Sequence, residues 1–278
     1  MFQKKAKADD GNKSSVVNFG AGWFPIIYCL LMFWFYVGMC NDGSNVTVPA
    51  IAANLRVENS TLLTMNSIAG LVGVVFFIVM GQINRKIGAR YLSGILCVAA
   101  GVAYYGVCNA SSVGMYLVFM CIVTGSIMSA GYICGGALVA QWFPKKKGVV
   151  MGYTTMGHNL GSAFYCVIFS ALISRFLIGK GVLPISLAII ILGIVGMLFI
   201  RDTPQERHIN PDNVSDAVFK SEYDMDDEDE TGGWTVKKLL SKRELWLASI
   251  TTGLFQICSV GVMSQLVLRN EELGFSAQ

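Results

Sequence analysis

Residues 81–90, "GQINRKIGAR", form a short polar stretch between two long apolar ones. The stretch has no acid, but it holds three cations and two glycines: Gly81, Arg85, Lys86, Gly88 and Arg90. Glycine permits the backbone conformations that tight turns need. Basic residues collect in the cytoplasmic loops of membrane proteins. The stretch is therefore predicted to be a tight cytoplasmic turn between two membrane-spanning helices.

The composition supports a membrane environment for most of the chain. Its 278 residues are 54% hydrophobic and 14% charged, whereas soluble domains carry roughly 25% charge. The net charge of +3 is small and gives no reason to expect nucleic-acid binding. The eight cysteines have no CxxC spacing and lie mostly in apolar runs, so we interpret them as packing residues. No cofactor or metal is expected.

Runs without charge predict seven transmembrane helices, since each crossing needs about 20 mainly apolar residues. The run at 91–144 is long enough for two helices, with a turn at 109–114. The other five runs are 14–41, 59–84, 148–174, 181–200 and 245–268. Backbone groups exposed to lipid must be hydrogen-bonded within their own segment, and these runs lack the alternation of barrel strands. The predicted fold is therefore all-α.

The distribution of Lys and Arg predicts the orientation and the domains. With the N-terminus in the cytoplasm, 17 of the 21 cations lie on inner segments, as the positive-inside rule requires. We expect a multi-pass protein of the plasma (inner) membrane. Its predicted parts are a cytoplasmic tail (1–22), a six-helix bundle (23–200), an acidic cytoplasmic loop with an interfacial helix (201–243) and the first helix of an incomplete second bundle (244–278). Within the loop, "DMDDEDE" (224–230) is interpreted as a solvated linker.

The basic stretch resembles the loop pattern G-x-L-A-D-R-x-G-R-R of the major facilitator superfamily. Five of its residues match: Gly81, Ile83, Lys86, Gly88 and Arg90. Arg85 stands where the pattern has Asp, and Ala89 stands where it has Arg. Since 82–90 and 143–148 contain no acid, the expected partners of these cations are Asp202, Glu206 or acids in the second half that the resemblance implies.

A second stretch, residues 130–164, is similar to spans four and five of the oxalate/formate-antiporter-like branch. "WTVKKLLSKRELW" (234–246) fits the entry to that branch's seventh span. The resemblance covers roughly 22–278. It implies a twelve-span transporter in two six-helix halves, which moves a small solute by alternating access. The branch suggests a monocarboxylate or dicarboxylate, with a coupling proton or a counter-substrate. The chain ends after seven spans, so C-terminal truncation is expected, and such a fragment is not expected to transport alone.

Span five carries the clearest polar face. Six side chains fall within about 100° of one another on a helix: Met151, Thr154, Thr155, His158, Ser162 and Tyr165. One interpretation is a stripe that faces a central aqueous path, where His158 binds an anion or moves a proton. The alternative is that His158 hydrogen-bonds a neighbouring helix and only packs. The stripe makes Thr155, His158, Ser162 and Tyr165 candidate path residues.

The outer end of span one, "NDGSNVTVP" (41–49), allows two interpretations. It is either an ordinary exit turn or a broken or extended helix whose polar groups line the path. The second interpretation makes Asn41, Asp42 and Asn45 candidates. Two further candidates are Tyr132 in span four and Gln256 in span seven. Spans three and six have almost no polar residues, so they are expected at the lipid-facing periphery.

Two other functions fit the sequence less well. A seven-helix receptor or retinal protein should have its N-terminus outside, and a retinal protein needs a Lys that 245–268 lacks. A membrane-embedded enzyme with a Ser/His/Asp site would have to bring His158 and Asp42 together, although the two are predicted at different depths. A transporter, not an enzyme, is therefore the favoured function.

Overall fold

The computed structural model describes residues 19–216, 218–219, 238 and 240–272, and every regular element in these ranges is helical. The tail before Phe19 and the acidic run 224–230 lie outside the described residues. In chain order the elements are η1 (Gly20–Gly22), α1 (Trp23–Cys40), α2 (Ser44–Leu55), α3 (Asn59–Ile87), α4 (Ala89–Cys108), α5 (Val113–Met128), the π-helical η2 (Ser129–Cys134), α6 (Gly135–Trp142), α7 (Lys147–Gly181), α8 (Leu183–Phe199), η3 (Pro204–Arg207), η4 (Pro211–Asn213) and α11 (Arg243–Glu272).

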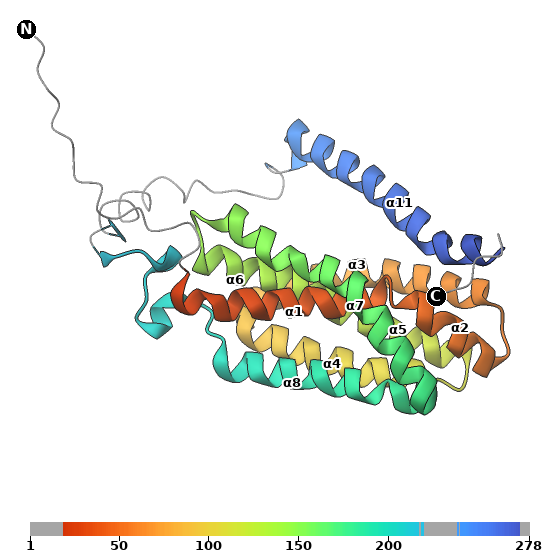
Figure 1. The fold of residues 1–278 in the computed structure, drawn as a ribbon. Coiled ribbons are helices and arrows are strands. Elements are labelled where there is room, and N and C mark those ends of the chain that lie inside the picture. The colour runs from red at the N-terminus through yellow and green to blue at the C-terminus, as the bar shows by residue number, and fades with distance from the viewer. Residues whose placement is uncertain (1–18, 217, 220–237, 239, 273–278) are drawn as a thin grey trace, which may run out of the picture.

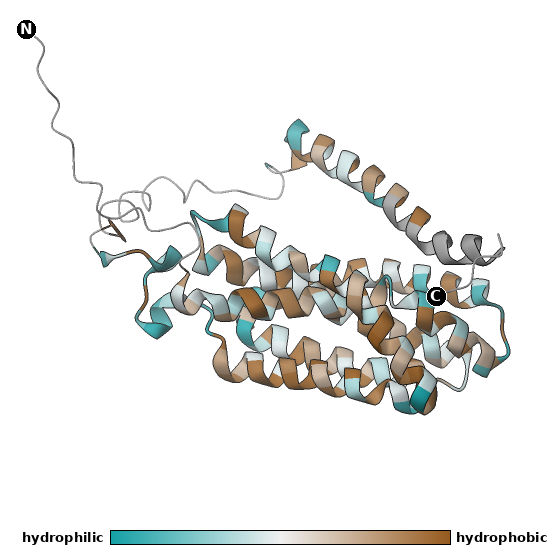
Figure 2. Ribbon diagram, in the orientation of Figure 1, coloured by the Kyte–Doolittle hydropathy of each residue, from teal (hydrophilic) through white to brown (hydrophobic). Residues whose placement is uncertain are grey.

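The helices follow the predicted apolar runs, which confirms the all-α membrane fold. Five helical units in the described part of the chain are long and apolar enough to cross a membrane: Gly20–Leu55, Asn59–Ile87, Ala89–Cys108, Val113–Trp142 and Lys147–Gly181. Leu183–Phe199 is a shorter apolar helix. These helices run side by side as one bundle, while α11 lies apart from it and runs obliquely (Figure 1). Apolar residues predominate along the helices, and hydrophilic ones gather at their ends (Figure 2).

The turn within the basic stretch 81–90 is shorter than the sequence predicted, because α3 ends at Ile87 and α4 begins at Ala89. Gly81 lies inside α3, and only Gly88 leaves the helical conformation, with φ +88°. Glycine tolerates this φ because it has no Cβ.

Asp202, expected as a partner of the cations, follows α8 and comes close to this turn, but it hydrogen-bonds the backbone. The Arg90 side chain donates instead to the carbonyl oxygen of Met197 at 2.7 Å. Oδ1 of Asp202 accepts the backbone N–H of Arg90 at 2.8 Å, and a Cβ on Gly88 would lie 2.6 Å from the other carboxylate oxygen of Asp202. An acid from the end of α8 therefore caps the first turn of α4.

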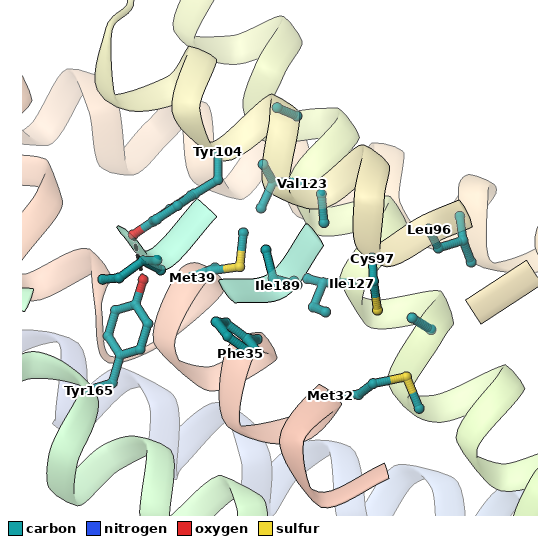
Figure 3. Packing of buried hydrophobic residues seen from close by; sticks show 14 of the residues in the cluster. Met32, Phe35, Met39, Leu96, Cys97, Tyr104, Val123, Ile127, Tyr165 and Ile189 are labelled. Carbon is teal, nitrogen blue, oxygen red and sulfur yellow. Dashed lines mark hydrogen bonds between the residues drawn. The ribbon is translucent and has the colours of Figure 1, made fainter. Parts of the chain in front are cut away.

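The core lies between α1, α4 and the helices around them. α1 packs mainly on α7, and α4 packs mainly on α8 and α5. Buried side chains from these helices meet at the centre (Figure 3), including Met32, Leu96, Val123 and Ile189. Glycines allow close helix contacts: a Cβ on Gly94 would lie 2.7 Å from the carbonyl oxygen of Gly193.

The expectation that span three is peripheral fits only one face of α4, because most of this helix is buried. Over an apolar stretch of 18 residues in each helix, 67% of the residues are buried in α4, compared with 17% in α3 and 22% in α7. One face of α4 packs on α5 and α8, while Ile95 and Val102 on another face are about half exposed. Span six fits the expectation better. Ile189 and Gly193 of α8 are buried, whereas Ile191 and Leu198 are exposed.

The first span is a broken helix, with a turn at residues 41–43 after which the chain is helical again. α1 ends at Cys40 and α2 begins at Ser44. The Tyr165 ring fills the notch at this break, since a Cβ on Gly38 would lie 2.1 Å from it. Its hydroxyl donates to the hydroxyl of Tyr104 at 3.0 Å (Figure 3). The thiol of Cys166 donates to the carbonyl oxygen of Asp42 at 3.2 Å.

The residues after α8 cross back over the end of the bundle, and we call residues 200–213 the strap. The indole N–H of Trp142 donates to the carbonyl oxygen of Arg201 at 2.9 Å. Asp212 is fully buried. Its carboxylate accepts the backbone N–H groups of Lys145 and Lys146, both at 3.0 Å. The strap therefore holds the turn between α6 and α7.

Candidate solute-path site

Tyr132 on η2 and His158 on α7 form a hydrogen-bonded pair between two spans. The Tyr132 hydroxyl oxygen lies 3.1 Å from Nε2 of His158. Nδ1 of His158 lies 3.3 Å from the carbonyl oxygen of Thr155. A carbonyl can only accept, so Nδ1 carries the proton and Nε2 is left to accept from the Tyr132 O–H. The pair thus places one imidazole and one phenol together at an exposed face of the apolar bundle.

Two aromatic side chains of α1 complete what we call the aromatic cluster: Phe33, Tyr36, Tyr132 and His158. The Phe33 and His158 rings lie 4.5 Å apart between centroids, tilted by 31°. The Tyr36 ring is 5.4 Å from that of Tyr132 and 5.9 Å from that of His158. Phe33 is buried, whereas Tyr132 is 41% exposed. The cluster therefore has a packed base and an open side.

The π-helical turn is what presents Tyr132. Residues 129–134 form a π-helical turn, in which hydrogen bonds join residues five apart and not four apart as in an α-helix. Regular α-helical periodicity, as applied to span four from the sequence, does not predict this bulge. Single π turns inside α-helices occur frequently at functional sites. The location of η2 at the open side of the aromatic cluster fits that pattern.

The polar stripe of span five divides into two faces. Thr155 and Ser162 are exposed and flank His158 on α7. Their hydroxyls donate within the helix, Thr155 to the carbonyl of Met151 at 2.8 Å and Ser162 to that of His158 at 3.1 Å. Their oxygen lone pairs remain able to accept hydrogen bonds. These two residues extend the open side of the aromatic cluster along α7.

Tyr165 does not join this face. It is fully buried, as is Thr154, and its ring packs at the break in the first span. Gly157 and Gly161 lie on the same buried side of α7, against the backbone of α1. The predicted polar stripe of α7 covers about 100° of the helix surface, so residues at its two edges can face different neighbouring helices. The structure therefore brings together Tyr132, Thr155, His158 and Ser162 but leaves Tyr165 in the core.

Of the candidates at the ends of the other spans, Asn41 reaches the aromatic cluster, where its side chain hydrogen-bonds that of Tyr36. Asn41, Asp42 and Asn45 are half-buried at the break between α1 and α2. Gln256 is exposed on α11, and no contact in the described part of the chain joins it to the aromatic cluster. Sequence reasoning missed Phe33 and Tyr36. The signal was present as two aromatic residues three positions apart, which share one helix face.

The site has no fixed charge of its own. In residues 23–199 the Lys and Arg residues stand at helix ends: Arg56, Arg85, Lys86, Arg90, Lys145, Lys146, Lys147, Arg175 and Lys180. Among the described residues, no three His, Cys, Asp or Glu side chains gather as metal ligands would. The site can therefore offer hydrogen bonds, aromatic faces and one titratable imidazole.

Comparison with known proteins gives a consistent family match. The model of the Major Facilitator Superfamily matches residues 17–278. The hexose-6-phosphate:phosphate antiporter of Salmonella typhimurium is 21% identical over 244 residues, which is 78% of this chain and 52% of that protein. The antiporter of the same name in Escherichia coli K12 gives the same identity and coverage. A putative glycerol-3-phosphate transporter 3 of Arabidopsis thaliana is 31% identical over 153 residues, 53% of this chain and 30% of that protein. The chain thus spans about half the length of the antiporters it matches.

Proposed function

The chain belongs to the major facilitator superfamily, and we propose that it serves secondary active transport of a small solute across the plasma membrane by alternating access. The observation that carries the proposal is the open aromatic cluster, in which Tyr132 and His158 are hydrogen-bonded at the exposed face of the bundle. Polar and ionisable side chains within a membrane are costly and mark solute or ion pathways. The relatives are named for transport, which supports a transporter over an enzyme or a receptor.

The proposed substrate is a small organic anion. The relatives are named for phosphate esters and phosphate, whereas the sequence resemblance to the oxalate/formate branch suggests a carboxylate. Both classes accept hydrogen bonds. The donors of the cluster, the Tyr132 hydroxyl and the His158 imidazole, bond Nε2 of His158 and the Thr155 carbonyl, so a solute would have to replace one of these partners. Protonation of His158 at Nε2 would reverse its hydrogen bond with Tyr132 and add a positive charge. A counter-substrate or a coupling proton is part of the proposal.

The solute path can be tested by thiol chemistry on α7. In a variant without the eight native cysteines, Ser162→Cys should react with a charged methanethiosulfonate at least about tenfold faster than Val167→Cys. The thiolate is the reactive form, and lipid excludes both it and a charged reagent. Val167 is the matched control because it is 68% exposed on the same helix but on another face.

Added solutes then distinguish the substrate classes. Glucose 6-phosphate or inorganic phosphate should slow the labelling of Ser162→Cys if the site takes phosphate compounds, and oxalate should slow it if the site takes carboxylates. Equal labelling rates at positions 162 and 167 would show that the face of His158 is covered by lipid. The proposed path would then be abandoned.

The proposed orientation places the strap and Gly88 in the cytoplasm. Ser111 lies in the turn between α4 and α5, at the other end of the bundle, and Gln205 lies in η3; both are exposed. In intact cells, an impermeant maleimide should label Ser111→Cys at once and Gln205→Cys only after permeabilisation. The reverse pattern would overturn the orientation inferred from the cations.

A further inference from the structure

A second site lies at the end of the bundle away from Gly88 and the strap. It is a cavity of about 760 Å³ between the ends of α2, α4 and α7. Its polar lining residues are Asn54, Tyr105, Asn109, Arg175 and Lys180. No acid occurs among the residues that line it. The cavity therefore combines two cations with amide and hydroxyl donors, and no lining carboxylate competes for the cations.

The cavity wall contains the most strained backbone position of α7. Leu177 has φ 60° and ψ 160° inside the helix, and its side chain is 80% exposed. This region of the backbone map is nearly exclusive to glycine, and strain of this kind concentrates at ligand-binding sites. The break at Leu177 lies between Arg175 and Lys180 in the chain. It gives these two side chains directions that a continuous helix would not.

Asn109 fixes the far side of the break. Its Nδ2 donates to the carbonyl oxygen of Gly179 at 3.3 Å and to that of Tyr105 at 2.9 Å. A Cβ on Gly179 would lie 2.6 Å from Oδ1 of Asn109, so any other residue there would displace the Asn109 side chain. Arg175 and Lys180 therefore lie on a segment that is hydrogen-bonded to Asn109 at the end of α4.

We propose that this cavity binds a phosphate group through Arg175 and Lys180. Arginine offers a planar fork that matches phosphate oxygens, and lysine adds a point charge. Phe176 and Leu177 are exposed apolar side chains beside these cations, an arrangement typical of the membrane interface. The phosphate can therefore come from a lipid headgroup or from a soluble phosphate compound. The proposal does not rest on the transport function or on His158.

The test compares three variants of the whole chain in two assays. One assay titrates inorganic phosphate into the protein in detergent micelles. The other measures retention of phosphatidylglycerol by native mass spectrometry. The double variant Arg175→Gln/Lys180→Gln should bind at least about tenfold more weakly, as expected from the loss of two charge-assisted contacts. Arg56→Gln is the matched control, since Arg56 is an exposed cation at the same end of the bundle but outside the cavity lining.

Lys180→Arg keeps the charge and should keep the binding. Arg175 and Lys180 are both exposed, so neither the double variant nor Lys180→Arg should change the packing or the thermal midpoint of unfolding. An effect on phosphatidylglycerol alone would assign the site to a lipid headgroup, and an effect on inorganic phosphate as well would assign it to soluble phosphate. If the double variant and Arg56→Gln behave alike in both assays, the cavity is not a phosphate site.

Discussion

Gly157→Ala is expected to lower the free energy of unfolding by about 2–3 kcal/mol, the upper range for overpacking a closely packed interior. A Cβ at this position would lie 2.1 Å from the carbonyl oxygen of Leu30 and 3.0 Å from Cβ of Phe33. The first of these neighbours is backbone and cannot turn aside. α1 must therefore move away from α7, which separates the Phe33 ring from His158. Thermal unfolding of the purified chain in detergent measures the effect.

Gly152→Ala, on the same helix, is expected to raise the free energy of unfolding. Gly152 is exposed, and nothing lies within 4 Å of a Cβ placed there. Alanine is favoured over glycine inside a helix by roughly 0.5–1 kcal/mol, so this variant should be slightly more stable than the parent chain. If the two alanine variants have the same midpoint, the close α1–α7 contact described here is wrong.

Asp212→Ala is expected to release the strap and to cost about 3 kcal/mol. The change would leave two partly buried backbone N–H groups, of Lys145 and Lys146, without this acceptor, and each such loss costs roughly 1–3 kcal/mol. Asp212→Asn should cost less, because the amide oxygen can still accept and Asn tolerates the positive φ of 56°. Limited proteolysis of the strap and the thermal midpoint report the change.

The control for Asp212 is Asp216→Ala, four residues further along. Asp216 is exposed and accepts the side-chain N–H of Asn210 at 2.7 Å. Removing it should change stability by no more than about 0.5 kcal/mol, as for most surface substitutions. Equal protease sensitivity of the two alanine variants would mean that Asp212 does not hold the turn between α6 and α7.

Much of this architecture follows from local properties of the chain. Charge-free runs predicted the helices because the bilayer forces each segment to satisfy its own backbone and to exclude charge. These costs depend on a residue and its near neighbours, so they can be summed along the sequence. The loop pattern at 81–90 likewise indicated the family. His158 could be selected from the sequence because an ionisable residue in an apolar run is conspicuous on its own.

The tertiary structure decided which helix faces meet. Tyr165 and His158 share one stripe of α7, yet packing places Tyr165 in the core and His158 at the open side. The burial of α4, the break in the first span and the contact of Asp202 with α4 also depend on residues far apart in the chain. A helix face about 100° wide can touch two neighbours. Hydropathy does not indicate which neighbour, since both are apolar, and only the fit of glycine notches to particular side chains settles the choice.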